Sequence, residues 1–320
     1  MPVPGLVLLT GARGFIGRHL AQRLAALGHR VLGLGHGHWP EAMAARHGVH
    51  RWLNGDIHAA SLHALCGDLG PPSLVFHLAG GASVGAAIAN PREDFDRTVT
   101  TTANLLEWLR LTAPGAAVVA VSSAAVYGGG HPGPIGEQDA LTPYSPYGHH
   151  KLMMESLCRS YGDTYGLKSV AARLFSVYGA GLQKQLLWDL CGKLAAGTPS
   201  ITLGGTGEEL RDWIAVDDVV SALLRLAGQA SAAVPAFNVG SGLAVPVREV
   251  AMRVMTHWAA SRQVAAPALQ FTGQSRPGDP FSLHADIGRL QLLGQAPALA
   301  LDEGLARYVA WFPGAPDLAG

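Results

Sequence analysis

The sequence predicts an α/β protein: a doubly wound parallel sheet with helices on both faces and a smaller C-terminal α/β cap. Two observations support this fold class. Short apolar runs closed by glycine alternate with segments of helical periodicity through the first half of the chain, and a glycine-rich turn follows the first run. Strands that alternate with helices require a parallel sheet that is covered on both faces.

The first half supplies most of the expected sheet. Its buried strands are expected at residues 5–11, 29–35, 49–57, 73–80, 116–128 and 167–179, where apolar runs are closed by glycine or polar residues. Helices are expected at 15–28, with Gly28 as the C-cap, at 94–112, and from Tyr147 onward. Ligands of such a sheet bind beyond the carboxyl ends of the strands.

After Gly179 the alternation loosens. Helices are expected at 188–197, 246–260 and 301–312, a strand, a turn and a helix within 201–227, a strand at 236–242, and a loop with a short helix at 275–294. We therefore expect a dinucleotide-binding domain at residues 1–175 plus about 212–240, and a substrate-binding cap at 176–211 and 241–320.

The composition excludes several functional classes. The 320 residues carry no net charge and no basic run, so neither nucleic acid nor a membrane surface is an expected partner. Three separated cysteines form no disulfide framework and no CxxC pair, which is typical of the reducing cytosol. The apolar N-terminus lacks a basic region and is too short to span a membrane, so we expect a cytoplasmic protein without a signal peptide.

Residues 10–17, "TGARGFIG", place three glycines between the first strand and the first helix. Gly11 permits the tight turn, Gly14 lets the backbone approach a pyrophosphate, and Gly17 allows close packing of helix on strand. The helix that starts at Phe15 and Ile16 then offers unpaired N–H groups to the phosphates. This context predicts a dinucleotide site and a Rossmann-type sheet.

The end of the second strand bears on the choice between NAD and NADP. An acidic residue there would accept the ribose hydroxyls of NAD, but Gly35 occupies the position, and Arg13 of the glycine loop can pair with a 2′-phosphate. Both features favour NADP, although His36 and His38 are weaker phosphate partners than arginine. No second ligand cluster accompanies these histidines, so no metal site is predicted. Asp56 and Ile57 follow the third strand, where they would bracket the adenine; the alternative for Asp56 is a turn or capping residue.

Tyr147 and Lys151 lie four residues apart at the start of an expected helix. Residues at this spacing share a helix face, and a cation beside a phenol favours the phenolate, which makes tyrosine a usable base. The pair alone is weak evidence, since Tyr-x-x-x-Lys also arises by chance from an ordinary aromatic and a solvated charge.

Five motifs in order change this assessment: the glycine-rich turn, "HLAG" at 77–80, "SSAAVYG" at 122–128, "YGHHK" at 147–151 and "RDWIAVDDVV" at 211–220. Together with "NVGSG" and "RPGD" later on, they resemble the extended short-chain dehydrogenase/reductase family, and particularly its nucleotide-sugar epimerases, reductases and dehydratases. The resemblance covers nearly the whole chain.

The resemblance implies a role for each motif. Tyr147 would be the catalytic acid/base, Lys151 would lower its pKa and hold the nicotinamide ribose, and Ser123 would bind the same sugar oxygen. Leu78, Ala79 and Gly80 of "HLAG" would contact the cofactor.

The residues after Ser123 restrict the expected reaction. Dehydratases of the family usually have an acidic residue there, whereas this chain has Ala124 and Ala125, which cannot transfer protons. Water elimination is therefore not expected, and hydride transfer at one carbon remains.

The resemblance also places the substrate. Arg211 and Arg276 match positions that hold the nucleotide diphosphate in relatives; the alternative is ordinary salt bridges to Asp212 and Asp279. Relatives commonly have asparagine where this chain has Ser176, which is the third expected substrate contact, and also where it has Thr98.

Three functions follow from these observations. The first is C4 epimerisation of a UDP-sugar through a transient 4-keto sugar, and family abundance favours it. The second is NADPH-dependent reduction of a nucleotide-4-keto-6-deoxyhexose, which Gly35 and Arg13 favour. A non-enzymatic dinucleotide sensor is a third, minor interpretation, because Ser123, Tyr147 and Lys151 are all present. The family resemblance further implies polysaccharide-precursor synthesis and a homodimer that pairs through residues 95–112 and 147–163.

Overall fold

The computed structural model describes residues 4–274 and 280–313. The elements of the large sheet and its covering helices are β1 (Leu6–Thr10), α1 (Phe15–Ala26), β2 (Arg30–Gly35), α2 (Glu41–Arg46), β3 (Val49–Asn54), α3 (Ala59–Cys66), β4 (Leu74–His77), α4 (Val84–Ala89), α5 (Pro91–Phe95), α6 (Thr101–Thr112), β5 (Ala117–Ser123), α7 (Pro146–Tyr165), β6 (Lys168–Leu174), α9 (Val216–Leu226) and β10 (Ala236–Val239). Short connecting turns of helix follow α3, α5, β5 and α9.

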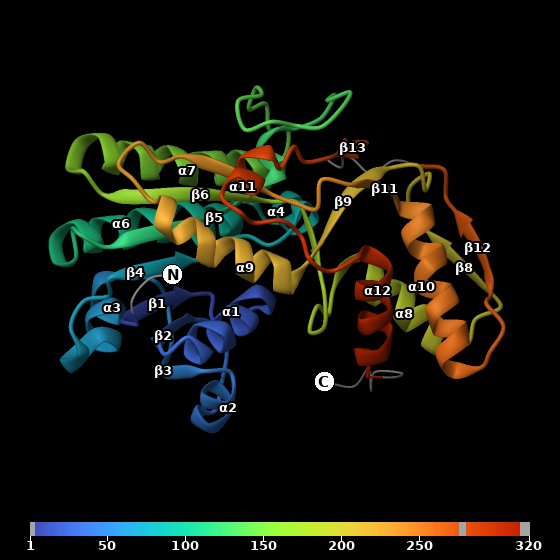
Figure 1. Ribbon diagram of the computed structural model, residues 1–320, viewed down its shortest axis with the longest axis horizontal. Coiled ribbons are helices and arrows are strands. Elements are labelled where there is room, and N and C mark those ends of the chain that lie inside the picture. Colours follow the sequence, from blue (N-terminus) through green and yellow to red (C-terminus); the bar gives the residue numbers. More distant parts are fainter. Residues whose placement is uncertain (1–3, 275–279, 314–320) are drawn as a thin grey trace.

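The large sheet has seven parallel strands in the order β10-β6-β5-β4-β1-β2-β3 (Figure 1). The chain runs outward from β1 through β2 to β3 and then returns to β4, which pairs with the opposite edge of β1. The doubly wound fold predicted from the sequence is therefore confirmed. The order reverses between β1 and β4, and in this fold the crevice at such a reversal receives the ligand.

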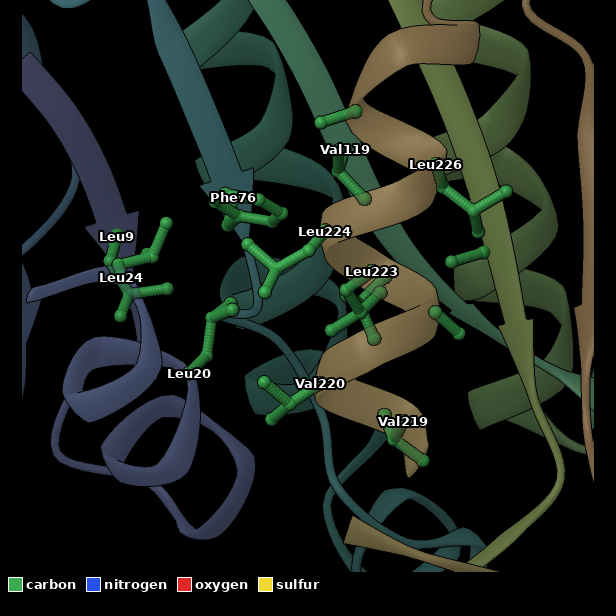
Figure 2. Close-up of a cluster of buried hydrophobic side chains, with 14 of the residues drawn as sticks. Leu9, Leu20, Leu24, Phe76, Val119, Val219, Val220, Leu223, Leu224 and Leu226 are labelled. Atoms are coloured by element: carbon green, nitrogen blue, oxygen red, sulfur yellow. The ribbon is translucent and has the colours of Figure 1, made fainter. Parts of the chain in front are cut away.

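Two apolar layers bury the sheet. On one face α1 and α9 pack against the strands, and Figure 2 shows leucines of α1 meeting valines and leucines of α9 over Leu9, Phe76 and Val119. On the other face α3, α6 and α7 supply the buried side chains. Both faces are covered by apolar side chains, which explains why the strands are continuous apolar runs in the sequence.

The remaining elements are β7 (Ser176–Tyr178), α8 (Gln185–Ala195), β8 (Ser200–Leu203), β9 (Leu210–Ala215), β11 (Ala244–Pro246), α10 (Val247–Arg262), β12 (Ala268–Phe271), β13 (Ser282–Leu283), α11 (Gly288–Leu292) and α12 (Leu301–Trp311). Most of them lie on the opposite side of the molecule from α2 and α3, whereas α11 lies over the large sheet beside β10 (Figure 1). β9 pairs with β7, β11 and β13, β8 pairs with β12, and an apolar cluster joins α8, α10 and α12. The division into a dinucleotide-binding domain and a cap stays a prediction.

Several expected elements were wrong in detail. The strand expected at 116–128 ends at Ser123, where a short helical turn begins, and the strand expected at 167–179 is two strands, β6 and β7, which join different sheets. The helix expected at 94–112 is interrupted by a π-helical turn at Asp96–Thr100. The expected single strand within 201–227 is also two, β8 and β9. In the described part of the chain no helix is long and apolar enough to cross a bilayer.

Candidate active site

The loop after β1 has the shape that a diphosphate requires. Gly11 adopts φ +71°, and its N–H donates to the Leu34 carbonyl at 2.7 Å, which folds the loop over the end of β2. A Cβ at Gly17 would lie 2.3 Å from the Gly11 carbonyl oxygen, so helix and loop touch without room for a side chain. Gly14 is the N-cap of α1, and neither a capping side chain nor an acidic residue in the first turn competes for the helix amides. The residues present therefore fit a bound dinucleotide.

A buried histidine fixes the loop after β4. His77 Nδ1 lies 2.8 Å from Thr10 Oγ1, and its Nε2 lies 3.0 Å from Thr102 Oγ1. Thr10 Oγ1 also accepts a hydrogen bond from Ala79 N at 3.2 Å. Burial, with a smaller effect from the Lys151 charge, lowers the pKa of His77 to about 3, so the ring is neutral and links β1, β4 and α6.

Leu78 and Ala79 thus lie directly beside the glycine loop: a Cβ at Gly11 would be 3.1 Å from both Ala79 N and the Leu78 carbonyl carbon. Gly80 lies further along, where a Cβ would be 3.1 Å from Lys151 Nζ. Thr98 accepts a hydrogen bond at its Oγ1 from Gly81 N at 2.8 Å. The threonine hydroxyl therefore anchors the far end of this loop. The two loops flank the reversal point between β1 and β4.

Residues that the sequence predicts for the adenosine end gather after β2 and β3. His36 Nε2 lies 3.3 Å from Asp56 Oδ1, and both side chains are exposed. The Arg13 guanidinium packs against Gly37, where a Cβ would lie 2.4 Å from Nη1. Ile57 is buried, and its carbonyl accepts a hydrogen bond from Asn104 Nδ2 at 2.9 Å. A carboxylate is thus present near the end of β2, although it follows β3 and does not come from position 35.

Ser123, Tyr147 and Lys151 come together where β5 ends and α7 begins. Ser145 caps α7 by accepting a hydrogen bond from Gly148 N at 3.2 Å, which sets the first turn that carries Tyr147. Lys151 is buried, donates to the Val121 carbonyl at 3.0 Å, and holds Nζ 5.8 Å from the centroid of the Tyr147 ring. The helix thus presents phenol and ammonium to one site, as their spacing in the sequence predicts.

The ionisation of this group follows from its burial. The pKa of Tyr147 lies above its ordinary value: burial raises it most, hydrogen bonding with Ser123 lowers it in part, and the Asp94 charge raises it further. Burial lowers the pKa of Lys151 to about 8, while Asp94 and Glu155 oppose that change. Lys151 is still mostly protonated at neutral pH and can favour the phenolate.

Sequence reasoning missed a buried network behind these residues. Glu155, one turn after Lys151, accepts hydrogen bonds from Ser122 Oγ at 2.7 Å and from Arg173 Nε at 3.0 Å. Arg173 Nη1 also donates to the Tyr127 hydroxyl at 2.8 Å, which in turn donates to Asn238 Oδ1 at 2.6 Å. Asp94 and His150 form a second buried pair. Nothing in the local pattern distinguishes Asp94, His150 and Glu155 from solvated helix charges; only their tertiary contacts do.

The predicted substrate residues lie on the smaller sheet or outside the described residues. Ser176 starts β7 and pairs with Trp213 of β9. Arg211 Nη1 donates to the carbonyls of Leu210 at 2.8 Å and Phe281 at 3.3 Å. Arg276 and its alternative partner Asp279 lie outside the described residues.

The neighbour of Arg211 has partners of its own. Asp212 accepts hydrogen bonds from Ser241, Gly242 and Ala285, which tie β9 to the loop after β10 and to the segment after β13.

Comparison with known proteins identifies relatives. The model of the NAD dependent epimerase/dehydratase family matches residues 7–240. UDP-glucose 4-epimerase of Mycolicibacterium smegmatis is 32% identical over 95% of this chain and 97% of its own, and a probable UDP-glucuronate 4-epimerase of Rhizobium meliloti is 30% identical over 95% and 96%. The solved structure of MoeE5 in complex with UDP-glucuronic acid and NAD has a TM-score of 0.81 at 32% identity, and covers 95% of this chain and 98% of that chain.

Proposed function

The chain belongs to the NAD-dependent epimerase/dehydratase family, and on that premise we propose that it epimerises a UDP-linked hexose at C4. The single observation that carries the proposal is the placement of Ser123, Tyr147 and Lys151 at the ends of β5 and α7, beside the loop after β4. The 4-epimerases among its relatives support the reaction and the UDP-sugar substrate class.

Each residue of the trio has a chemical role in this proposal. Tyr147, as the phenolate, takes the proton of the sugar 4-hydroxyl and later returns it, which makes it both base and acid. Lys151 stabilises the phenolate through its charge, and Ser123 orients the 4-oxygen through its hydroxyl. The bound nicotinamide cofactor supplies an acceptor for the hydride of C4. Because Ala124 and Ala125 carry no proton-transferring group, elimination of water is not supported.

The proposed cofactor is NAD, held by the glycine loop (Gly11, Arg13, Gly14, Phe15, Ile16 and Gly17), by His36, Asp56 and Ile57, and by Leu78, Ala79, Gly80, Tyr147 and Lys151. Two observations support NAD over the NADP that Gly35 and Arg13 favoured in the sequence. The related MoeE5 structure contains NAD. The exposed Asp56 carboxylate, beside His36, would repel a 2′-phosphate, whereas it can accept from a ribose hydroxyl.

The substrate side, the assembly and the location complete the proposal. We assign Ser176, Arg211 and Arg276 to the nucleotide diphosphate, because arginine forks grip phosphate oxygens in pairs.

Residues 1–175 with about 212–240 form the dinucleotide-binding domain, and 176–211 with 241–320 form the cap. The protein acts in the cytoplasm, in polysaccharide-precursor synthesis. It forms a homodimer through α6 and α7, and the exposed apolar side chains of Leu111 on α6 and Met153 on α7 support this interface.

Two assays test this function together. The purified protein, without added cofactor, is incubated with UDP-glucose and in parallel with UDP-glucuronate, and the nucleotide released by denaturation is identified by mass. We expect C4 interconversion of at least one sugar and tightly held NAD. An empty site, no interconversion, and NADPH-dependent reduction of a nucleotide-4-keto-6-deoxyhexose would favour the reductase instead.

A further inference from the structure

Asp94 of α5 and His150 of α7 form a short contact inside the protein. Asp94 Oδ2 lies 2.5 Å from His150 Nδ1, and the two side chains are 5% and 11% exposed. The Phe95 ring meets the imidazole edge-on, with ring centroids 5.4 Å apart, and covers the pair from one side. A carboxylate that is buried this deeply needs a hydrogen-bonded counter-charge, and His150 is placed to supply it.

The pair adjoins the proposed catalytic residues. His150 immediately precedes Lys151 and follows Tyr147 by three residues, so all three side chains leave one turn of α7. The Asp94 carboxylate occupies the space over Gly81, where a Cβ would lie 1.7 Å from Oδ1. A Cβ at the neighbouring Gly80 would lie 3.1 Å from Lys151 Nζ. Asp94 therefore lies between the loop after β4 and the helix of the reacting groups.

We propose that Asp94 and His150 form a carboxylate–imidazolium pair whose mutual neutralisation sets the pH range in which Tyr147 works. Both are positioning residues, since they act on the reaction through Tyr147 and Lys151. The inference rests on the proposed function, because it assigns the pair a role in the same proton transfer.

Electrostatics gives the two members opposite effects. Burial raises the pKa of Tyr147, and the negative charge of Asp94 raises it further, which disfavours the phenolate. The same charge opposes the lowering of the Lys151 pKa by burial, which keeps that ammonium charged. A positive charge on His150, next to that carboxylate, cancels most of this field. Removing the carboxylate should therefore make Tyr147 more acidic, and removing the imidazolium should make it less acidic.

Other charges near the pair are accounted for within the described residues. Glu155 acts on Lys151 from the same helix, and α4 carries no titratable side chain. The remaining charged groups of α5 and the π-helical turn pair with one another: Arg92 with Asp96, and Glu93 with Arg97. Asp96, 44% exposed, belongs to one of these outer pairs and serves as a matched control.

The test uses the NAD-loaded protein and variants Asp94→Asn, His150→Asn and the double variant. The ionisation of Tyr147 is read from ultraviolet absorbance as the difference from Tyr147→Phe in each background, and the pH dependence of kcat with UDP-glucose is measured in parallel. We expect Asp94→Asn to move both midpoints down and His150→Asn to move them up, each by roughly 0.5–1 pH unit. The double variant should return toward the parent, and Asp96→Asn should not shift.

Shifts of the two single variants in the same direction, or no shift in either, would overturn the proposal even if activity falls. If His150→Asn fails to fold, Asp94→Asn still decides, since an unchanged midpoint contradicts the pair's role. The absorbance titration needs no turnover. Opposite shifts in a protein without epimerase activity would therefore refute the proposed function alone, and an active protein without opposite shifts would refute the pair alone.

Discussion

Arg173 of β6 binds Glu155 of α7 through two hydrogen bonds, Nε to Oε1 at 3.0 Å and Nη2 to Oε2 at 2.8 Å, and their side chains are 2% and 0% exposed. Because Glu155 also accepts from Ser122, the same carboxylate connects α7 to β5 next to Ser123. The register of the helix that carries Tyr147 and Lys151 therefore depends on a buried ion pair. A buried charge without its partner is unfavourable, so removing either Glu155 or Arg173 alone should destabilise the folded protein.

Glu155→Gln should lower the free energy of unfolding by about 3 kcal/mol, because it leaves the buried Arg173 charge without its partner. Urea unfolding measures the change. Glu303→Gln breaks an exposed i,i+4 pair with Arg307 and should cost less than about 0.5 kcal/mol. The double variant Glu155→Leu/Arg173→Met, which removes both charges, should regain part of the loss; equal losses in Glu155→Gln and Glu303→Gln would contradict the pair's role.

Gly17→Ala should release bound NAD, because its Cβ would lie 2.3 Å from the Gly11 carbonyl oxygen and would force the glycine loop away from α1. The expected result is a fall in NAD content of the purified protein by more than about tenfold, equivalent to ~1.4 kcal/mol of binding free energy. Gly192→Ala in α8 is the control, since a Cβ at that position would meet no atom within 4 Å. That variant should keep its NAD; equal loss in both would refute the interpretation.

His77 should make the fold sensitive to acid. Burial lowers the pKa of His77 from 6.5 to about 3. Between pH 6.5 and pH 3, His77 is therefore protonated in the unfolded chain but neutral in the native protein. The contribution to stability is therefore full above pH 6.5 and is lost as the pH falls, by up to about 1.4 kcal/mol per pH unit. Unfolding free energies measured from pH 7 to 4 should fall less steeply in His77→Gln than in the parent, while the exposed His149→Gln keeps the parent slope.

Tyr147→Phe should lower kcat by about 10²- to 10⁴-fold, because it removes the group that takes and returns the 4-hydroxyl proton. NAD content and unfolding free energy should change little. Tyr165→Phe, at the exposed end of the same helix, is the matched control and should keep full activity. Full activity in Tyr147→Phe would remove the mechanism.

Local sequence patterns were sufficient to predict the large parallel sheet and part of the candidate active site. Glycine spacing at 11, 14 and 17 and the i,i+4 spacing of Tyr147 and Lys151 are properties of a single turn or helix, so they can be recognised without tertiary structure. The break between β6 and β7 could not be recognised, because residues 167–179 form one largely apolar run although its two halves enter different sheets.

The supporting residues required the structure. Asp94 and His150 lie on α5 and α7, and Glu155 and Arg173 lie on α7 and β6, so no periodicity within one element relates the partners. Charged residues are usually solvated, and only the structure shows that these four are buried. Tertiary contacts, and not local pattern, determine the electrostatics around Tyr147.

The fate of the C4 hydrogen during the reaction tests the proposed C4 epimerisation most directly. UDP-glucose deuterated at C4 is incubated with the purified protein and no added cofactor, and the C4 epimer is analysed by mass and proton resonance. We predict that deuterium is retained at C4 of the product, because the hydride that leaves one face returns to the other within the same protein. Loss of the label, or consumption of the sugar without formation of its C4 epimer, would contradict C4 epimerisation by internal hydride return.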